Sequence, residues 1–359
     1  MSQQRLDNMR HKMEARGLDA MLISKGENLR YLSGFTAGSD ALLLLSHQDQ
    51  YILTDSRYTE QAKRECPNWS LILEKPPDHK ELKQLGKKYQ RIAFESQDLS
   101  YYEYLQLEQE ISSQLIPTLG MVEELRMIKE EKELELLRKT AKIGDQVFKK
   151  ICSLIRVGIS ESYIANQLLY YLKEYGCEKE SFDIISVAGA NAALPHGRPG
   201  SNLLQAGDML TLDYGGFYQG YASDMTRTVA IARADRELRD KYQAVLEAQI
   251  NGVNMVKAGE SCSAIDRAVR KSLKKHELGE FFIHGTGHGL GLEIHESPRV
   301  SSQSSEILEK NMLITIEPGI YIPGWGGIRI EDTVIVKDGG CEIITHSDKN
   351  LLIIDGGII

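Results

Sequence analysis

The chain has 359 residues and a formal net charge of −8, with 42% hydrophobic and 26% charged residues. These proportions are typical of a soluble globular protein that is long enough for one large domain or two smaller ones. The negative charge argues against a nucleic-acid-binding protein, which needs a basic face to displace counterions from phosphates. The longest apolar runs, such as Ala41–Leu45, have the length of a strand and not of a membrane span.

The five cysteines are scattered without any CxxC pair, and the N-terminal stretch MSQQRLDNMRHKMEARG is polar. Sparse, odd-numbered cysteines exclude a cysteine zinc site and give no disulfide framework. A polar start without an apolar core is not typical of a secretory signal. We therefore expect a reduced, cytoplasmic protein.

Residues 1 to about 120 alternate short apolar runs with helical patterns, which predicts a mixed α/β domain of about five strands. The expected strands are Ala20–Ser24, Ala41–Ser46, Tyr51–Thr54, Leu71–Leu73 and Ile92–Phe94. The expected helices are Leu6–Arg16, Glu60–Glu65, His79–Tyr89 and Tyr102–Ile111.

From Glu123 to Lys142 the composition shifts to charges of both signs, interleaved with Leu and Ile at helical spacing. This pattern predicts a long helix, or a linker running into one, and we place a domain boundary between residues 122 and 123. Ser160 is a candidate N-cap of a later helix, and Gly176 is its expected stop.

The second half, residues 123–359, adds further helices and six strand-like stretches. The expected helices are Ile143–Ile155, Tyr163–Tyr175, Leu238–Val256 and Ile265–Leu273. The expected strands are Phe182–Val187, Met209–Tyr214, Tyr221–Ile231, Leu292–His295, Met312–Ile322 and Ile328–Val336. This order predicts an α+β domain in which helices cover one side of a curved, mainly antiparallel sheet.

The stretch LTLDYGGFYQGYASDMTRT, residues 210–228, is typical of a short antiparallel hairpin with a QG turn. That turn places Thr226 opposite Asp213. It also places Gly215 opposite Asp224, and the period of two puts all four on one face. The aspartates then lie on a diagonal, with Cα atoms about 7–8 Å apart. Like charges this close repel unless a cation or a proton lies between them, although an isolated pair of this kind is more often two solvated carboxylates.

Four histidines lie beside glycine or proline: His196 in ALPHGRPG, and His284, His288 and His295 in HGTGHGLGLEIHES. The alternating glycines argue against a helical His-x3-His zinc site. A dinucleotide-binding loop is excluded because no apolar strand leads in and no helix follows. The remaining interpretation is an extended or looped backbone that carries the histidines, in which glycine lets other groups approach the backbone closely. One such histidine alone is more often a packed residue, but three within twelve residues favour a site.

Glu317 in MLITIEPGIYI and Glu331 in GGIRIEDTVIV interrupt segments that are otherwise apolar and β-branched. An ionised glutamate in such a strand is destabilising unless it is paired or bound to a metal. The alternative is a half-exposed strand on which each glutamate faces water. Arg329, two residues before Glu331 and so on the same face, is an alternative salt-bridge partner.

The second half thus offers four carboxylates, Asp213, Asp224, Glu317 and Glu331, together with a choice of histidines. This set is too rich in oxygen for one tetrahedral zinc, and it suits two divalent ions about 3.5–4 Å apart. Hard oxygen ligands favour Mn²⁺, with Co²⁺ or Zn²⁺ as alternatives.

The segments LDYGG…SDMTRT, HGTGHGLGLEIHE, TIEPGIY and IRIEDTV, in this order, resemble the pita-bread metallopeptidases. These are the Xaa-Pro dipeptidases (prolidases), the Xaa-Pro aminopeptidases and the methionine aminopeptidases. The first half is similar to the creatinase/prolidase-type N-terminal domain through GENLRYLSGF and YILTDSRY. Methionine aminopeptidases generally lack that domain. The resemblance therefore implies a proline-directed peptidase with its N-terminal domain at residues 1–122 and its pita-bread catalytic domain at residues 123–359.

Roles for five metal ligands follow from this resemblance. Asp213 is expected to chelate one metal, and Asp224 and Glu331 are expected to bridge both. His288 and Glu317 are expected to complete the other site. A bridging hydroxide would be the nucleophile, and Glu317 would also shuttle its proton toward the leaving proline nitrogen.

The resemblance also assigns five residues around the metals. His196 and His295 match catalytic, substrate-facing histidines around the scissile peptide, and His284 matches the histidine beside the pocket for the proline ring. Thr226 and Arg329 match positions that hold the bridging carboxylates in place.

The expected function is metal-dependent hydrolysis of Xaa-Pro bonds in dipeptides or short peptides, with a dipeptidase preferred over an aminopeptidase. The expected partners are a proline-containing peptide substrate and, by resemblance, a second copy of the chain in a homodimer. The alternatives are a metal-free pita-bread binding module, a creatinase-like enzyme and a methionine aminopeptidase. Metal-free members lack several of the five ligands, whereas this chain has all five.

Overall fold

The structure, a computed structural model, describes residues 3–38, 40–74 and 79–355. Contacts divide the chain into two compact units, Met1–Arg126 and Met127–Ile359. The boundary that the composition suggests, between residues 122 and 123, stays a prediction. Among the described residues, none of the helices combines the length and the apolar character that crossing a membrane requires.

The first unit is built on one six-stranded sheet with the strand order β4-β3-β2-β1-β5-β6. The sheet is mixed, since β1 pairs antiparallel with β2 and parallel with β5. Its strands are β1 (Ala20–Ile23), β2 (Ala41–Ser46), β3 (Gln50–Thr54), β4 (Ser70–Leu73), β5 (Arg91–Glu95) and β6 (Gln114–Thr118). Its helices are α1 (Gln3–Ala15), α2 (Gly26–Ser33), the 3₁₀ turn η1 (Ser56–Tyr58), α3 (Thr59–Glu65), α4 (Lys80–Gly86) and α5 (Tyr101–Glu110).

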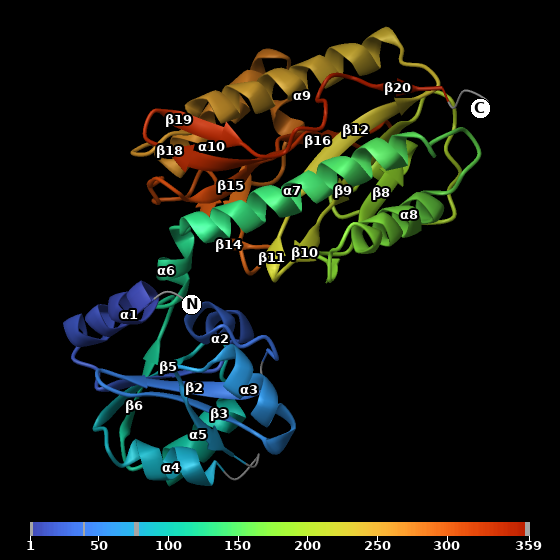
Figure 1. The fold of residues 1–359 in the computed structure, drawn as a ribbon. Coiled ribbons are helices and arrows are strands. Elements are labelled where there is room, and N and C mark those ends of the chain that lie inside the picture. The colour runs from blue at the N-terminus through green and yellow to red at the C-terminus, as the bar shows by residue number, and fades with distance from the viewer. Residues whose placement is uncertain (1–2, 39, 75–78, 356–359) are drawn as a thin grey trace. The chain divides into compact units, whose positions relative to one another are not determined.

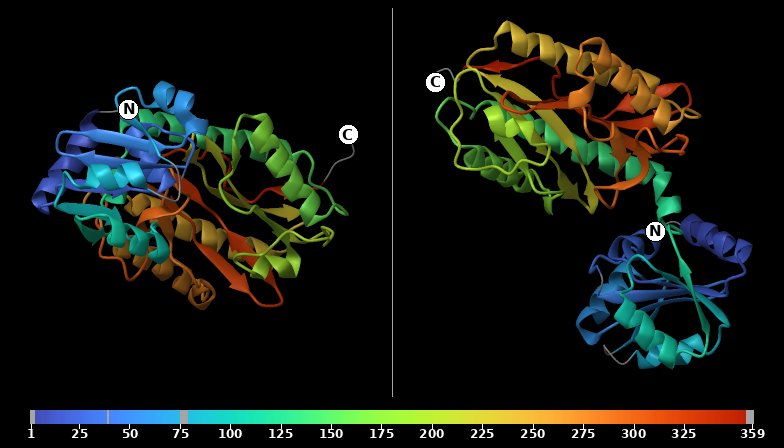
Figure 2. Two further views of the ribbon diagram at one scale, coloured as in Figure 1. Left: turned by 90° about the horizontal axis from the view of Figure 1, so that it is seen from below. Right: turned by 180° about the vertical axis from the view of Figure 1, so that it is seen from behind.

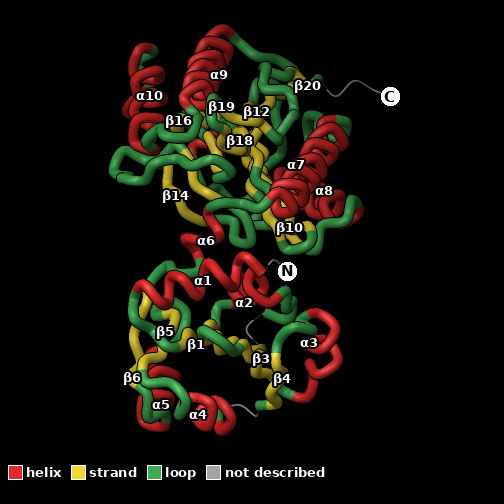
Figure 3. Tube along the Cα trace, turned by 60° about the vertical axis from the view of Figure 1, so that its left-hand side comes forward, coloured by secondary structure: helices red, strands yellow, loops and turns green. Residues whose placement is uncertain are grey.

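Helices cover both faces of this sheet, with α1 and α2 on one side and α4 and α5 on the other (Figures 1 and 3). The mixed α/β prediction is confirmed, with one strand and one helix more than expected. The sequence pattern does not predict strand β6, because Pro117 interrupts its short apolar run. Proline cannot donate a ladder hydrogen bond, and β6 is an edge strand, where that loss is tolerated.

The second unit combines longer helices with several small sheets. Its helices are α7 (Glu131–Cys152), α8 (Glu161–Glu174), α9 (Arg236–Met255), α10 (Cys262–Lys275) and the 3₁₀ turns η2 (Gly189–Ala193) and η3 (Gly279–Phe281), and α6 (Glu123–Met127) precedes α7. Its strands are β7 (Lys179–Glu180), β8 (Ile185–Ala188), β9 (Met209–Tyr214), β10 (Gly216–Tyr218), β11 (Tyr221–Ala222), β12 (Met225–Ile231), β13 (Gly287–Gly289), β14 (Glu296–Val300), β15 (Leu313–Ile316), β16 (Gly319–Ile322), β17 (Gly326–Arg329), β18 (Asp332–Lys337), β19 (Gly340–Ile343) and β20 (Ile353–Ile354).

Two of these sheets form the platform of the unit, with the strand orders β20-β12-β9-β8 and β14-β13-β15-β18-β19. Their pairings are antiparallel except that β12 and β20 run parallel. Helices α7 and α8 pack on the first sheet, where Phe148 and Leu168 meet Leu212. Helices α9 and α10 pack on the second, where Val253 and Ile265 meet Ile314 (Figure 2). The prediction of helices covering a mainly antiparallel sheet is confirmed.

Over Glu123–Lys142 the sequence predicts a long helix or a linker running into one. The second alternative is confirmed, because the chain leaves the helix between α6 and the long helix α7. Lys129 N donates to Asn311 O, which connects this break to the segment before β15 within the second unit. Glu130 and Glu133 then form a capping box that starts α7. The predicted ends of α8 are confirmed, since Ser160 Oγ accepts from Tyr163 N and Gly176 has a φ of 104°.

Three expected strands are each divided into two. Asp224 lies between β11 and β12, Glu317 between β15 and β16, and Glu331 between β17 and β18. A fourth expected strand, Leu292–His295, is wrong, because these residues form bends and β14 starts only at Glu296. The divided strands matter for function, since each is interrupted at a carboxylate.

Candidate metal centre

The hairpin of β9 and β12 brings two aspartates together in the register that the sequence predicts. Asp213 pairs with Thr226, and the turn residues Gln219 and Gly220 both have positive φ, 47° and 78°, as a type I′ turn requires. One carboxylate oxygen each from Asp213, Asp224 and Glu331 lie within 4.8 Å of one another, and all three residues are buried. The alternative of two solvated carboxylates is therefore wrong.

The two glutamates reach the aspartates from the second sheet. Glu331 is 1% exposed, and its Oε2 accepts from Thr226 Oγ1 at 2.8 Å. The side chain of Glu317 is 19% exposed, and its Oε1 accepts from Thr315 Oγ1 at 3.2 Å. Neither glutamate simply faces water, so the half-exposed-strand alternative fails. We call Asp213, Asp224, Glu317 and Glu331 the carboxylate cluster.

His288 completes this cluster from β13. Its Nε2 lies 3.5 Å from Asp224 Oδ2 and 3.5 Å from Glu317 Oε1. Its Nδ1 lies 3.0 Å from the carbonyl oxygen of Gly289, so Nδ1–H donates to that carbonyl and Nε2 faces the carboxylates. A histidine that binds a metal characteristically has its other ring nitrogen fixed in this way.

Glycine is needed on both sides of His288 because other backbone crosses there. A Cβ on Gly287 would lie 1.9 Å from Thr315 O, and one on Gly289 would lie 2.3 Å from Ser297 O. Both distances are far inside van der Waals contact, so no side chain fits. The predicted close approach at this extended segment is confirmed.

Arg329 anchors the cluster from β17, but not through the glutamate on its own segment. Its Nη2 donates to Asp213 Oδ2 at 2.5 Å, and its Nε donates to Thr226 Oγ1 at 3.1 Å. The alternative of a salt bridge to Glu331 is therefore wrong. Thr226 connects the two sides, since it accepts from Arg329 and donates to Glu331.

His284 lies beside the cluster and is linked to it by a tyrosine. The Tyr321 hydroxyl lies 2.9 Å from His284 Nε2 and accepts from Arg329 Nη1 at 2.6 Å. Because His284 Nδ1 lies 2.8 Å from Gly285 O, Nδ1–H donates to that carbonyl and Nε2 accepts from the phenol. Burial, together with the charge of Arg329, lowers the pKa of His284 to about 4.

The other two candidate histidines reach the same region from loops. The ring of His295 packs edge-on against that of His288, with the centroids 4.5 Å apart. His196 is exposed, and it follows Pro195, whose carbonyl accepts from Arg329 Nη1 at 3.4 Å. The structure thus brings all the candidate side chains to one region, with His196 at its solvent side.

The loop that carries His196 is fixed by a buried glutamate at the start of α8. Glu161 is fully buried, and its carboxylate accepts from Ala188 N at 2.8 Å and from Gly200 N at 3.0 Å. A carboxylate that accepts backbone N–H groups at both ends of a loop restricts the loop. The position of His196 is therefore restrained, although its side chain is open to solvent.

The electrostatics of the carboxylate cluster favour a cation. Burial raises the pKa of Asp224 to about 6 and that of Glu317 to about 7. Burial also raises the pKa of Glu331 well above its ordinary value, and the charges of Asp224 and Glu317 raise it further. Burial lowers the pKa of His288, but Asp224 and Glu317 outweigh burial and raise it to about 9. Positive charge is therefore stabilised at His288 Nε2, where it faces the carboxylates.

Two oxygen atoms of the cluster test whether a metal fits. Asp213 Oδ1 and Glu331 Oε1 are buried and have no hydrogen-bond partner among the described residues. Buried carboxylate oxygens are otherwise nearly always satisfied, so such atoms require an explanation. Hard divalent cations bind carboxylate oxygens of this kind. The donor set and its unsatisfied oxygens therefore fit divalent metal ions.

Tyr321, Glu161 and Asp266 contribute to the site and were not recognised from the sequence. Asp266 of α10 is fully buried and accepts from Thr286 Oγ1 at 2.9 Å, which fixes the backbone beside His288. Glu161 and Asp266 lie in segments whose pattern predicts only packing, and Tyr321 lies in the segment of Glu317 without a feature that marks it. The available signal in the sequence was an acidic residue at the start or on the apolar face of an amphipathic helix, as with Glu161 and Asp266.

Comparison with known proteins places both units. Residues 135–338 match the family model of metallopeptidase family M24, and residues 5–128 match the creatinase/prolidase N-terminal domain. The chain is 40% identical over 357 residues to an uncharacterized peptidase of Bacillus subtilis, covering 98% of this chain and 100% of the relative. It is 32% identical to the Xaa-Pro dipeptidase of Pyrococcus furiosus, over 97% of this chain and 99% of the relative.

Solved structures give the same result. An Xaa-Pro dipeptidase from Bacillus anthracis superposes with a TM-score of 0.95 at 39% identity, covering 98% of this chain and 99% of the other. An X-Pro aminopeptidase from Thermotoga maritima superposes with a TM-score of 0.89 at 33% identity, covering 97% and 99%. The chain is therefore an M24-family peptidase of the prolidase type, with a creatinase/prolidase N-terminal domain followed by a pita-bread domain.

Proposed function

We propose that this peptidase cuts the bond before proline in dipeptides or short peptides and uses two divalent cations to do so. The observation that carries the proposal is the carboxylate cluster, in which two buried oxygens, Asp213 Oδ1 and Glu331 Oε1, have no partner among the described residues. The relatives named as Xaa-Pro dipeptidases support the substrate class. An Xaa-Pro amide lacks the N–H that other proteases bind, so a dedicated site is chemically reasonable.

Five residues would hold the cations. Asp213 would bind one ion, while Asp224 and Glu331 would be shared between two. His288 would bind the other ion through Nε2, because Nδ1 is engaged with Gly289 O, and Glu317 would join it. When bound, the cations would supply Lewis acidity and acidify a water nucleophile. We propose Mn²⁺, because most of the donors are hard oxygens, with Co²⁺ or Zn²⁺ as alternatives.

The remaining side chains would bind substrate and move protons. Glu317, whose pKa is raised to about 7 by burial, would accept the proton of the nucleophile and deliver it to the leaving proline nitrogen. His196 and His295 would donate hydrogen bonds around the scissile peptide. His284, held neutral by burial and by Arg329, would line the place of the proline ring.

The substrate length is the open part of this proposal. We favour a dipeptidase, and the similarity to the X-Pro aminopeptidase of Thermotoga maritima supports the second candidate. We further propose a cytoplasmic homodimer whose domains divide between residues 122 and 123. The five free cysteines suit a reducing compartment, and size-exclusion chromatography with light scattering tests the dimer.

The decisive experiment is metal analysis combined with a peptidase assay. The full chain, stripped with a chelator and reloaded with Mn²⁺, should bind two ions and hydrolyse a Gly-Pro-type dipeptide faster than a longer peptide with proline second. Faster turnover of the longer peptide would identify an aminopeptidase. A chain that binds no divalent ion and stays inactive with Mn²⁺ would instead be a metal-free binding protein, and the proposal would fail.

A further inference from the structure

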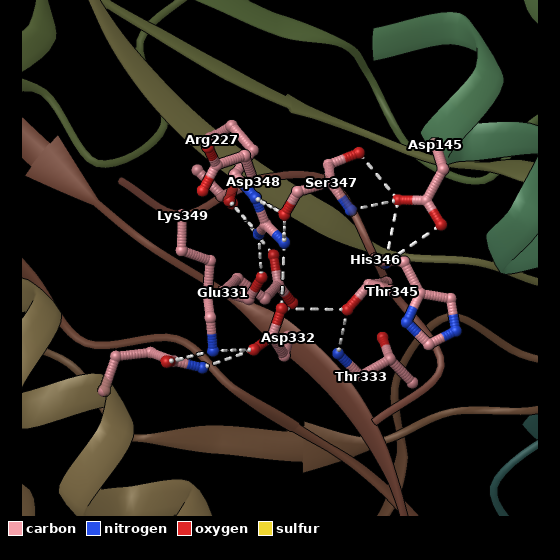
Figure 4. Close-up of polar contacts among 12 residues, drawn as sticks. Asp145, Arg227, Glu331, Asp332, Thr333, Thr345, His346, Ser347, Asp348 and Lys349 are labelled. Carbon is pink, nitrogen blue, oxygen red and sulfur yellow. Dashed lines mark hydrogen bonds and ion pairs between the residues drawn. The ribbon is translucent and has the colours of Figure 1, made fainter. Parts of the chain in front are cut away.

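The face of β12 and β18 that points away from the carboxylate cluster carries a second buried polar group. Thr226 and Arg227 are adjacent in β12 and therefore point to opposite faces. Their acid partners divide accordingly, since Thr226 donates to Glu331 and Arg227 donates to Asp332. Arg227 Nη2 donates to Asp332 Oδ1 at 2.9 Å, and both side chains are 1% exposed or less. Figure 4 shows this pair beside the C-terminal residues 345–349. We call Arg227, Asp332 and their partners Gln249, Thr345 and Lys349 the arginine cluster.

Both oxygens of Asp332 are satisfied by side chains from several elements. Oδ1 accepts from Arg227 and from Thr345 Oγ1, the latter at 3.0 Å. Oδ2 accepts from Gln249 Nε2 at 3.0 Å and from Lys349 Nζ. One carboxylate therefore joins β12, helix α9 and the C-terminal segment.

Arg227 in turn binds backbone directly behind the carboxylate cluster. Its Nη1 donates to Thr226 O at 2.9 Å and also to Glu331 O. Glu331 N itself donates to Thr226 O at 3.2 Å. The guanidinium thus fixes the spacing of the two residues whose side chains meet at Thr226 Oγ1 and Glu331 Oε2, 2.8 Å apart, on the other face.

The segment of residues 345–349 near the C-terminus connects the arginine cluster to two helices. Ser347 O accepts from Arg227 Nη2 at 2.8 Å, and Ser347 N donates to Asp145 Oδ1 of α7 at 2.7 Å. Tyr242 of α9 donates to Lys349 O at 2.9 Å. The segment therefore ties α7 and α9 to the backbone of the candidate metal centre (Figure 4).

We propose that Arg227 and Asp332 are positioning residues for the metal centre, which act through the backbone of Glu331 and not by contact with metal or substrate. The inference rests on the proposed function, since it assigns Glu331 to the cations. A buried ion pair contributes little stability beyond that of a well-packed apolar pair of similar volume. The distinctive feature of the Arg227–Asp332 pair is that Arg227 also binds the carbonyl oxygens of Thr226 and Glu331. Removing a residue that holds a metal ligand in place characteristically weakens metal affinity about 10–100-fold.

The test is titration of Mn²⁺ into the metal-free full chain by calorimetry. Asp332→Asn keeps the size of the side chain and removes its charge, which loosens Arg227. We expect the Kd of the more weakly bound ion to rise about 10–100-fold, and we expect raised Mn²⁺ to restore kcat. Lys349→Met, which removes one donor from Asp332, should give a smaller rise and serves if Asp332→Asn does not fold.

The matched control is Val336→Ala, on the same strand β18 but packed in the apolar core away from both clusters. It should lower the midpoint of thermal unfolding without changing either Kd. Wild-type binding of both ions by Asp332→Asn or Lys349→Met would overturn the positioning role and leave the proposed function standing. An equal loss of affinity in Val336→Ala would also overturn it, because general loosening would then suffice. If the wild-type chain binds no divalent ion, both proposals fail.

Discussion

Two buried polar clusters lie back to back across β12 and β18, and they differ in how completely their charges are satisfied. In the arginine cluster, the Asp332 carboxylate accepts hydrogen bonds from four side chains, one of which is its ion-pair partner Arg227. In the carboxylate cluster, Asp213 Oδ1 and Glu331 Oε1 have no partner among the described residues. Glu331 and Asp332 are both buried, with exposed fractions of 1% and 0%, so burial alone does not explain the difference.

This difference distinguishes a buried polar network that stabilises the fold, the arginine cluster, from one that is built to bind a further group, the carboxylate cluster. A buried network that is fully satisfied rigidifies its surroundings, whereas a partly satisfied one is destabilising unless a further group completes it. Glu331 and Asp332 belong to different clusters, although they are adjacent acids in the sequence. Removing a charge should therefore have opposite effects on the metal-free protein in the two clusters.

The largest expected effect belongs to Glu331→Ala. Loss of a ligand shared by two cations should remove several kcal/mol of transition-state stabilisation, which corresponds to a fall in kcat/KM of at least about 10³-fold. The second Mn²⁺ should also no longer bind stoichiometrically. Steady-state kinetics and metal analysis check both outcomes, and full activity would contradict the assignment of Glu331.

Glu331→Gln is the companion variant that tests the sign of the effect on stability. It keeps the side-chain volume and removes one of the repelling charges, so the metal-free protein should unfold at a higher temperature than wild type. With Mn²⁺ present, the variant should gain less stability than wild type does. Thermal unfolding with chelator and with Mn²⁺ measures both changes.

Asp332→Ala should act in the opposite direction. It leaves the buried guanidinium of Arg227 without its carboxylate, and breaking one side of a buried pair costs about 3–5 kcal/mol. This loss should appear with and without Mn²⁺, unlike the effect of Glu331→Gln. Denaturant unfolding measures it, and a loss confined to the metal-loaded protein would contradict the division between the clusters.

The next prediction concerns the pH dependence of stability. The folded-state pKa values of Asp224 and Glu317, about 6 and about 7, lie above the ordinary values near 4. The folded state therefore binds protons more tightly, so its stability is full below about pH 4 and falls as the pH rises to about 7. We expect the metal-free protein to lose on the order of 6 kcal/mol across this window, or about 3 kcal/mol for each carboxyl.

Mn²⁺ should remove most of that fall, because a cation stabilises the ionised carboxylates. Burial also raises the pKa of Glu95 in the first unit to about 7, and this contribution should persist with metal. The informative quantity is therefore the difference between unfolding free energies with chelator and with Mn²⁺ at pH 5 and pH 8. A difference that does not grow toward pH 8 would contradict a cation-binding carboxylate cluster.

Much of the fold could be predicted because the hairpin and the helices follow local patterns. The register of Asp213 against Thr226 follows from the turn position alone, and the caps of α8 follow from Ser160 and Gly176. The strand interruptions at Asp224, Glu317 and Glu331 could not be predicted from periodicity. They depend on tertiary pairing, as when Glu317 N donates to Thr286 O of another segment.

The arrangement behind the site was the least predictable part. Arg227 stands beside Thr226 in the sequence, but its partners Ser347 and Asp332 are more than one hundred residues away. Nothing in local spacing tells which buried arginine meets which acid. For the same reason Arg329 could be taken for a partner of Glu331, whereas it donates to Asp213 on a strand of another sheet.

The smallest expected effect belongs to Tyr321→Phe, at the edge of the carboxylate cluster. The phenol connects His284 Nε2 with Arg329 Nη1, and its removal leaves two buried polar groups without that partner, at a cost of about 1–3 kcal/mol. The ring still fills its space, and no oxygen of the cluster loses a donor. We expect kcat/KM on an Xaa-Pro dipeptide to fall about 10-fold, mainly through KM, with Mn²⁺ affinity unchanged.

Tyr214→Phe is the matched control for Tyr321→Phe. Its hydroxyl is also buried, but it donates to Gly144 O of α7 at 2.8 Å, on the helix side of the sheet. It should lower stability by a similar amount and leave kcat/KM unchanged. An equal loss of kcat/KM in both variants would mean that burial of a phenol, and not its link to His284, accounts for the effect. A change in Mn²⁺ affinity in Tyr321→Phe would mean that the carboxylate cluster extends further toward His284 than its contacts indicate.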